Sequence, residues 1–489
     1  MYIRNIDMAL SRSDAVLIPV LAGVMMGAID STIVVLALPT ISDSLRAPLS
    51  ISIWIILAYL LTAAVTTTQF GRLGDMKSRK TIFNSGMLIF TAGSFLCGVS
   101  PNIESLIAFR FVQAAGGSMM QANSGSIIAD SFPPNLRGRA YGYTSVGWNS
   151  GATLGIVLGG IITTLIGWRY IFYINVPIGL ISFYFAVKYI GHGETRTTHL
   201  DIPGVVTLSA ALVSLSYAAT DFTSHGLDAI NEALLLFGFI MIIIFIFLER
   251  TNSDALLPVS MFQNRVFNFS ILAAFLQSLG YLAVTFIIIM YLQGLRGLSP
   301  LDSSLLLVPG YVLGGFTGPV FGKLSDRVGA RLPATLGMML MAVAIVMYMQ
   351  LSLSTPLYYI IPISIISGLG SSMFFPANNS AVMASSPVRT YGGASGLLRT
   401  MANIGMLGSF VLAITVSTLS IPRYIAFEVF AGVGHLVGGV SASFLDGIHT
   451  ALAVSLGIIL VGAIFSFIRG KEERKSGSVS MPHSSNDPK

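Results

Sequence analysis

The apolar run AVLIPVLAGVMMGAIDSTIVVLAL, residues 15–38, decides the fold class of this chain. It holds one charged residue, Asp30, and it exceeds the about 20 mostly apolar residues that a helix needs to cross a bilayer. Its length and its internal carboxylate exclude a cleavable signal peptide, whose apolar region is shorter. The sequence therefore predicts a transmembrane helix near the start of the chain.

Similar runs recur along the whole chain, and about fourteen of them are long enough to span a bilayer. We therefore expect an all-α polytopic membrane protein. Residues 421–447 are apolar but Gly-rich, and we expect an outer loop with a short interfacial helix there, because a fifteenth span would move the basic C-terminal cluster outside. The predicted spans lie near residues 15–38, 50–70, 81–99, 104–129, 138–165, 168–190, 201–220, 230–248, 267–292, 301–321, 332–352, 358–383, 391–419 and 448–468.

The composition supports this class. Of the 489 residues 54% are hydrophobic and only 10% are charged, whereas a soluble domain has about 25% charged residues. An ordinary cytosolic enzyme and a disordered chain are therefore excluded. Cys97 is the single cysteine and the histidines are dispersed, so we expect no disulfide, no metal site and no cofactor. The chain has no P-loop, H-E-x-x-H or G-x-S-x-G motif, so we expect neither an enzyme nor an ATP-driven pump.

The distribution of Lys and Arg predicts the orientation. If the N-terminus is inside, only Arg46, Arg169, Arg296 and Arg423 lie in outer segments, and most of the 27 basic residues are cytoplasmic. This asymmetry follows the positive-inside rule, and it also accounts for the net charge of +6 without a nucleic-acid partner. We expect a multi-pass protein of the plasma membrane with both termini in the cytoplasm.

An internal repeat predicts the domain organisation. The motif GRLGD at residues 71–75 is echoed by GKLSD at residues 322–326, each after the second span of a six-helix unit. Parallel repeats of this kind are found in one class of secondary transporter. The predicted units are an N-terminal six-helix bundle (1–195), two linker transmembrane helices (196–260), a C-terminal six-helix bundle (261–470) and a disordered cytoplasmic tail (471–489).

Two charged residues inside spans lie at matching depth. At 1.5 Å per residue, Asp30 is roughly 13 Å and Arg110 roughly 9 Å below the same outer surface. Such charges are costly inside a bilayer unless they pair, so we expect an Asp30–Arg110 pair that carries proton coupling. The alternatives are a purely structural ion pair and an Arg110 that snorkels to the interface.

Other polar residues inside spans are candidates for a substrate cavity, although polar residues also simply join helices. Arg399 can either snorkel to the cytoplasmic interface or line the cavity. If it lines the cavity, two arginines face one aspartate, which favours anionic or neutral cargo over a cation. The candidates are Gln113, Asn149, Asn175, Gln277, Asn379 and Arg399.

Glycines and the two repeated motifs are candidates for a conformational gate. Glycine recurs every four residues from Gly147 to Gly159, which is typical of close helix packing and is alternatively a flexible gate. We expect Asp75 and Asp326 at tight cytoplasmic turns, where they can cap a helix or pair with arginine across the two halves. The gate candidates are Gly71, Asp75, Arg79, Gly322, Asp326, Arg327, Gly151, Gly155 and Gly159.

These motifs together resemble those of the major facilitator superfamily, and more narrowly those of its 14-helix drug:proton antiporter family. Three positions depart from the family pattern: Ile156 replaces a proline, Ser78 replaces a glycine, and Ala402 stands where the family usually has arginine. The segments that carry the resemblance are 29–39 in the first span, 71–80 in the loop signature, 110–113 in the fourth span, 151–160 in the fifth and 168–177 at the start of the sixth.

The resemblance implies proton-coupled antiport by alternating access, exporting small amphipathic compounds and so giving multidrug resistance. The expected partners are a small-molecule substrate, protons and the lipid bilayer, with the protein as a monomer. One alternative is a substrate-specific carrier for a metabolite, lipid or siderophore, in export or, given Ile156, in uptake. Another is a membrane sensor or scaffold that transports nothing.

Overall fold

The computed structural model describes residues 12–132, 134–191, 201–225, 228–251, 264–386, 391–419 and 440–470. Within these ranges the chain is helical and contains no strand. The elements are α1 (Arg12–Ser44), α2 (Leu49–Ser52), α3 (Trp54–Lys77), α4 (Arg79–Val99), α5 (Ile103–Ser131), α6 (Pro134–Leu165), α7 (Tyr170–Tyr173), α8 (Asn175–Tyr189), α9 (Ile202–His225), α10 (Ala229–Thr251), α11 (Arg265–Tyr281), α12 (Val284–Ile289), η2 (Met290–Leu295), α13 (Pro300–Val328), α14 (Arg331–Tyr348), η3 (Leu357–Tyr359), α15 (Ile360–Ala384), α16 (Tyr391–Leu419) and α18 (Val440–Ile468).

These elements match the fourteen predicted spans one for one. Thirteen helices in the described residues are long and apolar enough to cross a membrane. The remaining span, α5, is as long as the others but more polar, since it carries Arg110, Gln113 and Asp130. The expectation of an all-α polytopic membrane protein is confirmed.

Local sequence signals set the ends of several helices. Asn102 begins α5 with a capping box, in which its side-chain oxygen accepts a hydrogen bond from the backbone N–H of Ser105 at 2.9 Å. The Ser299 hydroxyl caps α13 by accepting a hydrogen bond from the backbone N–H of Asp302 at 3.1 Å, and Pro300 occupies the first helical position. Gly329 ends α13 with φ = 88°, a conformation that a residue with a Cβ rarely adopts.

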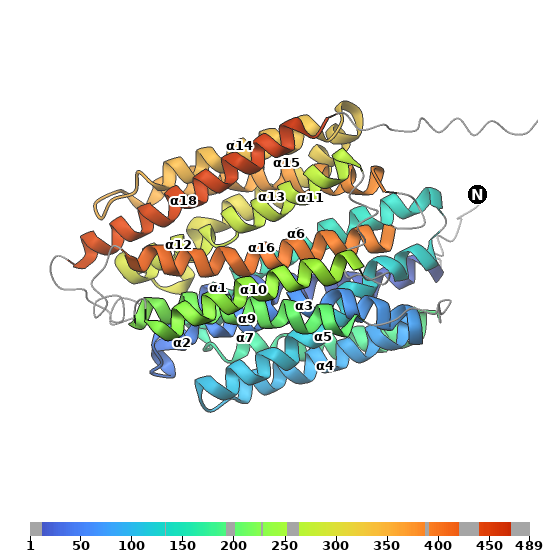
Figure 1. Ribbon diagram of the computed structural model, residues 1–489, viewed down its shortest axis with the longest axis horizontal. Coiled ribbons are helices and arrows are strands. Elements are labelled where there is room, and N and C mark those ends of the chain that lie inside the picture. The colour runs from blue at the N-terminus through green and yellow to red at the C-terminus, as the bar shows by residue number, and fades with distance from the viewer. Residues whose placement is uncertain are drawn as a thin grey trace, which may run out of the picture.

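The helices pack as two groups and a pair. One group contains α1, α3, α4, α5, α6 and α8, and the other contains α11, α13, α14, α15, α16 and α18. The contacts of α6 with α13 and of α3 with α16 join the two groups. The pair α9–α10 packs beside this seam, with α9 against both α3 and α16 (Figure 1). The predicted unit boundaries at 195 and 260 and the tail from 471 onward lie outside the described residues and stay a prediction.

Two expectations about the chain's path need correction. The last span begins at Val440 and not near 448, so the final part of segment 421–447 is helical, while 421–439 lies outside the described residues. The repeated motifs are not turns: residues 71–75 form the last turns of α3, and residues 322–326 belong to α13. The helix continues through each motif because the first break comes later, at Ser78 and at Gly329. The backbone at Ser78 is extended, so the backbone itself does not require glycine there, although the buried Ser78 hydroxyl has no hydrogen-bond partner among the described residues.

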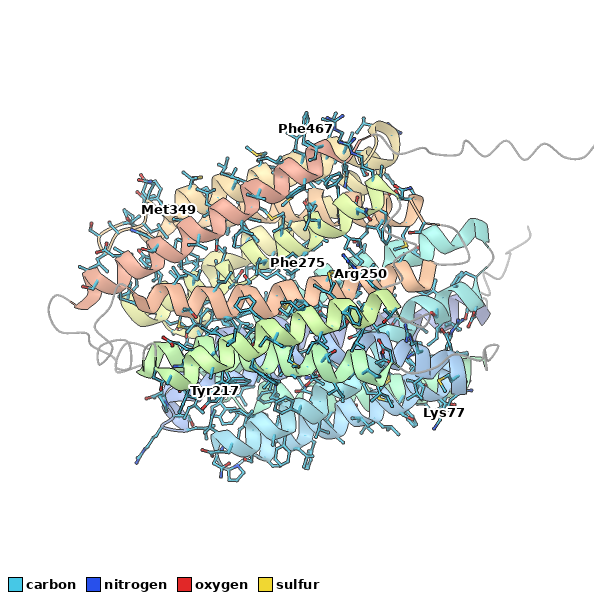
Figure 2. The ribbon with its side chains drawn as sticks, viewed as in Figure 1. Lys77, Tyr217, Arg250, Phe275, Met349 and Phe467 are labelled. Atoms are coloured by element: carbon cyan, nitrogen blue, oxygen red, sulfur yellow. The ribbon has the colours of Figure 1, made fainter. Side chains whose placement is uncertain are left out.

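The outer faces of the bundle are apolar. Phe316 and Phe247 are 77% and 66% exposed, and Phe467 points outward from α18 (Figure 2). Such a surface is unfavourable in water and suits a hydrocarbon environment. Lys77 lies toward one end of the bundle and Met349 toward the other (Figure 2). We call these the basic end, where α3 and α13 finish and α4 and α14 begin, and the opposite end.

The glycine stripe of α6 forms its contact with α1. A Cβ on Gly151 would lie 2.8 Å from the carbonyl oxygen of Met25, and a Cβ on Gly155 would lie 2.8 Å from that of Ile29. Glycine therefore allows α6 to approach the segment of α1 that carries Asp30. The stripe lies within one helix group, and its role as a gate stays a prediction.

We expect Gly155→Ala to lower the thermal stability of the purified protein, because backbone atoms of α1 occupy the space that a Cβ needs. Overpacking of this kind costs about 1–3 kcal/mol. The control is Gly457→Ala in α18, where nothing lies within 4 Å of the added Cβ. Melting temperatures in detergent should fall for Gly155→Ala and stay unchanged or rise for the control; equal values for both variants would contradict the packing.

Candidate functional site

A buried ion pair joins α1 to α5. The Nη1 atom of Arg110 lies 2.7 Å from Oδ2 of Asp30, and the two side chains are 2% and 0% exposed. The guanidinium Nε also donates to the backbone carbonyl of Ile55 in α3, at 2.9 Å. The structure thus brings together the two residues that the matching depths predicted, and Arg110 links three helices.

Gln113 and Ser94 complete the hydrogen bonding of this pair. Nη1 of Arg110 donates to Oε1 of Gln113 at 2.6 Å, and Nε2 of Gln113 donates to Oδ1 of Asp30 at 2.9 Å. The same Nε2 donates to the hydroxyl of Ser94 in α4 at 2.6 Å. Both carboxylate oxygens therefore accept a hydrogen bond, as a buried charge requires. We call Asp30, Arg110, Gln113 and Ser94 the ion-pair cluster.

Aromatic rings enclose the cation. The Cζ atom of Arg110 lies 4.4 Å from the ring centroid of Tyr59 and 5.9 Å from that of Phe172. Their π faces attract the guanidinium and keep bulk water away from it. The ion-pair cluster is therefore a neutral unit in an environment where charge interactions are strong.

Two cavities lie between the helix groups. The first, the basic-end cavity, has a volume of about 150 Å³, and its walls include Gly27, Trp148, Asn379, Arg399 and Asn403. The second, the central cavity, has a volume of about 180 Å³ and lies nearer the opposite end. Its walls include Tyr281, Tyr311 and Tyr348. Ser31, Trp148 and Met406 line both cavities, so the two are adjacent.

Arg399 lines the basic-end cavity and does not extend to the membrane interface. Its Cζ atom lies 5.3 Å from the ring centroid of Trp148, across the seam between α16 and α6. No Asp or Glu occurs among the described residues that line either cavity. The sequence was compatible with an Arg399 that snorkels to the interface or one that lines the cavity. The structure places it in the cavity wall.

A small pocket at Arg110 shares wall residues with both cavities. It has a volume of about 20 Å³ and is lined by Ser31, Tyr59, Arg110 and Met406, among others. A site needs about 10–15 Å³ to hold one water molecule, so this pocket can hold one. Asp30 itself lines neither cavity, and Ser31, its neighbour in the chain, lines both.

The other predicted cavity residues are distributed differently. Asn379 lines the basic-end cavity together with Arg399. Gln113 belongs to the ion-pair cluster instead of a cavity wall, and Asn175 and Gln277 are fully buried away from both cavities. The side chain of Asn149 lies outside the described residues. Polarity inside a span therefore identified buried groups but not which of them face the cavity.

Two of the gate candidates, Asp75 and Arg79, form a charge cluster with Asp130 at the basic end. Arg79 at the start of α4 lies 2.7 Å from Asp75 of α3 and 2.6 Å from Asp130 of α5. This bridge lies within one helix group, so the expected pairing of Asp75 across the two halves is not what the structure shows. In the second repeat, Arg327 is exposed and the side chain of Asp326 is outside the described residues. Cβ atoms on Gly71 and Gly322 would each lie 3.7 Å from one neighbour, Ala122 and Pro376 respectively.

Sequence reasoning missed several residues of the site. Asp130 had a usable signal, because it is a carboxylate at the end of the fourth predicted span, on the same side as Arg79. Ser94 and Tyr59 gave no such signal, since an uncharged residue in an apolar run does not reveal which neighbour it meets. Trp148 lies within the glycine stripe of α6, and the glycine pattern did not indicate that this residue lines a cavity.

Comparisons with known proteins agree with this architecture. A family model described as Major Facilitator Superfamily matches residues 20–409. The chain is 32% identical over 397 residues to the riboflavin transporter RibZ of Clostridioides difficile (strain 630), covering 80% of this chain and 85% of that protein. It is 28% identical to multidrug resistance protein 3 of Bacillus subtilis (strain 168), covering 82% and 79%.

The solved structures support the fold. A crystal structure of a bacterial homologue of the human lysosomal transporter Spinster superposes with a TM-score of 0.61 at 15% identity. The match covers 94% of this chain and 97% of that one. At this identity the likeness concerns the fold alone.

We expect Arg110→Met to destabilise the protein strongly, because it leaves the Asp30 carboxylate buried without its counter-charge. Removing one partner of a buried pair costs about 3–5 kcal/mol. The double variant Asp30→Asn/Arg110→Met removes both charges and should be the more stable of the two. Melting temperatures measure both effects, and a double variant no more stable than the single one would contradict the pairing.

The matched control for that experiment is Arg169→Met. Arg169 also stacks on an aromatic ring, 4.3 Å from the centroid of Trp168, and donates to the carbonyl of Ser100 at 3.1 Å. It has no carboxylate partner among the described residues. Its loss should therefore lower the melting temperature much less than the loss of Arg110.

Proposed function

This chain belongs to the Major Facilitator Superfamily, and from that premise we propose that it is a proton-coupled secondary transporter that exports small amphipathic compounds. In this proposal the protein is a multidrug efflux antiporter of the plasma membrane and works as a monomer. Its basic end and both termini face the cytoplasm, since basic residues concentrate on that side. The driving force is the proton gradient, so no cofactor takes part.

The observation that carries the proposal is the Asp30–Arg110 pair beside the cavities. An ionisable pair deep in a membrane protein is a functional hypothesis by default. A proton that reaches the carboxylate of Asp30 cancels its charge and leaves Arg110 without its counter-ion. The pocket of about 20 Å³ at Arg110 supplies room for the water molecule that delivers it. Protonation therefore changes the energy of the ion-pair cluster, and this is what a coupling site must do.

Alternating access requires contacts that break at one end while others form. At the opposite end, Nε2 of Gln293 donates to the carbonyl of Leu36 at 3.2 Å, and the hydroxyl of Thr164 accepts from the backbone N–H of Leu301 at 3.2 Å. These bonds join the two helix groups and must break for the cavities to open outward. The Arg79 cluster holds α3, α4 and α5 together, so this group can tilt as a unit.

The charge balance limits the cargo. One intramembrane carboxylate cannot neutralise both a dication and a proton, so neutral or monovalent cargo fits the site. The relatives support an amphipathic substrate in two ways: one is named for multidrug resistance and one for riboflavin. Export of several unrelated compounds is our first proposal.

A substrate-specific carrier is the second candidate, and the central cavity favours it. Hydroxyl groups there form directional hydrogen bonds, such as that between Tyr281 and Ser367 and the 3.1 Å bond between Tyr311 and Thr285. A site built from such groups can reject close analogues that lack a matching polar group. The 32% identity to a riboflavin transporter points the same way.

We expect Asp30→Asn to abolish pH-driven transport, because the amide cannot bind and release the coupling proton. The measurement is proton flux in proteoliposomes under an imposed pH gradient, with neutral, cationic and anionic amphiphiles added in turn. The control is Asp43→Asn, which removes an exposed carboxylate from the same helix and should leave flux unchanged. Normal gradient-driven export by the Asp30→Asn variant would contradict the proposed mechanism.

The same assay separates the two candidates. A multidrug exporter should dissipate the gradient with several unrelated compounds, whereas a specific carrier should respond to one compound and its close analogues. Tyr311→Phe removes one hydroxyl from the central cavity. It should change transport of many amphiphiles by less than about threefold, but it should reduce transport of a substrate that bonds this hydroxyl by about tenfold or more.

A further inference from the structure

We propose that Arg399, Asn403 and Trp148 form a subsite for an aromatic monoanion, with the acid group on Arg399 and Asn403 and the ring against Trp148. The proposal rests on the transport function given above, and it names the substrate class of that same cavity. The acid group in question is a carboxylate or sulfonate attached to a planar ring system.

The first argument is the charge of the cavity walls. Arg399 is the only residue with a formal charge among the described residues that line the two cavities. Arg110, which lines the small pocket beside them, is neutralised by Asp30, and both oxygens of that carboxylate are engaged by Arg110 and Gln113, so Asp30 does not serve Arg399. No described residue forms an ion pair with Arg399. A guanidinium without a counter-ion is costly at this depth, and a bound anion would neutralise it.

The second argument is an unused donor on the same helix face. Asn403 follows Arg399 by four residues in α16, so the two side chains lie one turn apart on one face. Asn403 lines the basic-end cavity and is only 9% exposed, and its Nδ2 has no hydrogen-bond partner. A buried amide N–H₂ without an acceptor is unfavourable. An acid group held by the fork of Arg399 would supply that acceptor.

The third argument concerns the ring. Trp148 lines both cavities, and Arg399 lies 5.3 Å from its ring centroid. A ligand whose acid group meets Arg399 therefore has the indole beside it, and a planar ring can stack there. The ring then extends past Met406 into the central cavity, where Tyr281 and Phe410 add apolar surface.

The size of the space agrees with a ligand of this kind. The two cavities, about 150 and 180 Å³, together reach the lower end of the ~300–1,000 Å³ range of small-molecule pockets. This space suits a compact two-ring acid better than a long-chain lipid. Cations are disfavoured, since neither wall offers a described carboxylate.

The test is equilibrium binding to the purified full chain in phosphatidylcholine nanodiscs, without any gradient. The probes are four compounds of one shape: 2-naphthoate, its neutral amide 2-naphthamide, the cation 2-naphthylmethylammonium, and the saturated acid decahydro-2-naphthoate. We expect 2-naphthoate to bind tightest, by about tenfold or more over the amide, because a charge-assisted bond replaces a neutral one. The saturated acid should bind more weakly than 2-naphthoate because it cannot stack.

Variants assign the effect to the subsite. Arg399→Gln should weaken 2-naphthoate about tenfold or more and leave 2-naphthamide within about twofold. Arg399→Lys keeps the charge and should retain part of the preference for the acid. Trp148→Leu should remove the difference between 2-naphthoate and its saturated analogue. The matched control is Arg331→Gln, since Arg331 also lies over a ring, 4.2 Å from the centroid of Phe467, but far from the cavities.

The outcomes separate this proposal from the proposed transport function. The subsite is wrong if the wild type binds none of the four probes, if the amide or the cation binds as tightly as the acid, or if Arg399→Gln changes nothing. Binding of 2-naphthoate through Arg399 supports the subsite even if no proton flux follows, in which case the export proposal alone fails. Proton-coupled transport of cations with no binding of 2-naphthoate would keep the transport proposal and overturn this one.

Discussion

The Asp30–Arg110 ion pair is the interaction on which the arrangement of the first helix group depends. In a medium that solvates charge poorly, neither group can stand alone, so α1 and α5 must meet at that depth. Arg110 then fixes α3 through the carbonyl of Ile55, and Gln113 fixes α4 through Ser94. The glycine stripe of α6 brings a fifth helix against α1 at the same level. Four side chains and a row of glycines thus position the helices that the first group contributes to the cavity walls.

Two arginines inside the helix bundle, Arg110 and Arg399, lie in contrasting environments. Arg110 is neutralised by Asp30 and enclosed by Tyr59 and Phe172, whereas Arg399 faces open volume beside Trp148. A proton that binds to Asp30 would change the charge balance around Arg110. Arg399, in contrast, is placed where a ligand could contact it. Ser31, Tyr59 and Met406 line both the small pocket at Arg110 and the basic-end cavity that holds Arg399.

The sequence predicted the fold well because the bilayer imposes a length and a composition on every span. Asp30 and Arg110 could be paired from depth alone, since a charge inside a bilayer needs a partner. The direction in which Arg399 points could not be predicted, because both snorkelling and cavity lining are compatible with its depth. The same limit applies to three buried amides, Gln113, Asn175 and Gln277. Helical periodicity and polarity indicate that such a residue is buried, but not which neighbour its amide contacts. The motifs around Asp75 and Asp326 misled because glycine and aspartate favour turns in water, whereas here packing continues the helices through them.

The polarity of α5 has a consequence for how the protein is made. Arginine within a span opposes partition from the translocon into lipid, by about 2.5–3.5 kcal/mol at the centre of a helix and by less toward its end, where Arg110 lies. The counter-charge of Arg110 lies in α1 and the carbonyl that it engages lies in α3, and both helices leave the ribosome before α5. Both must still be close by when α5 leaves the channel. Insertion of α5 is thus favoured when α1 and α3 are still beside the translocon, so the Asp30–Arg110 pair links the candidate site to the insertion of this half.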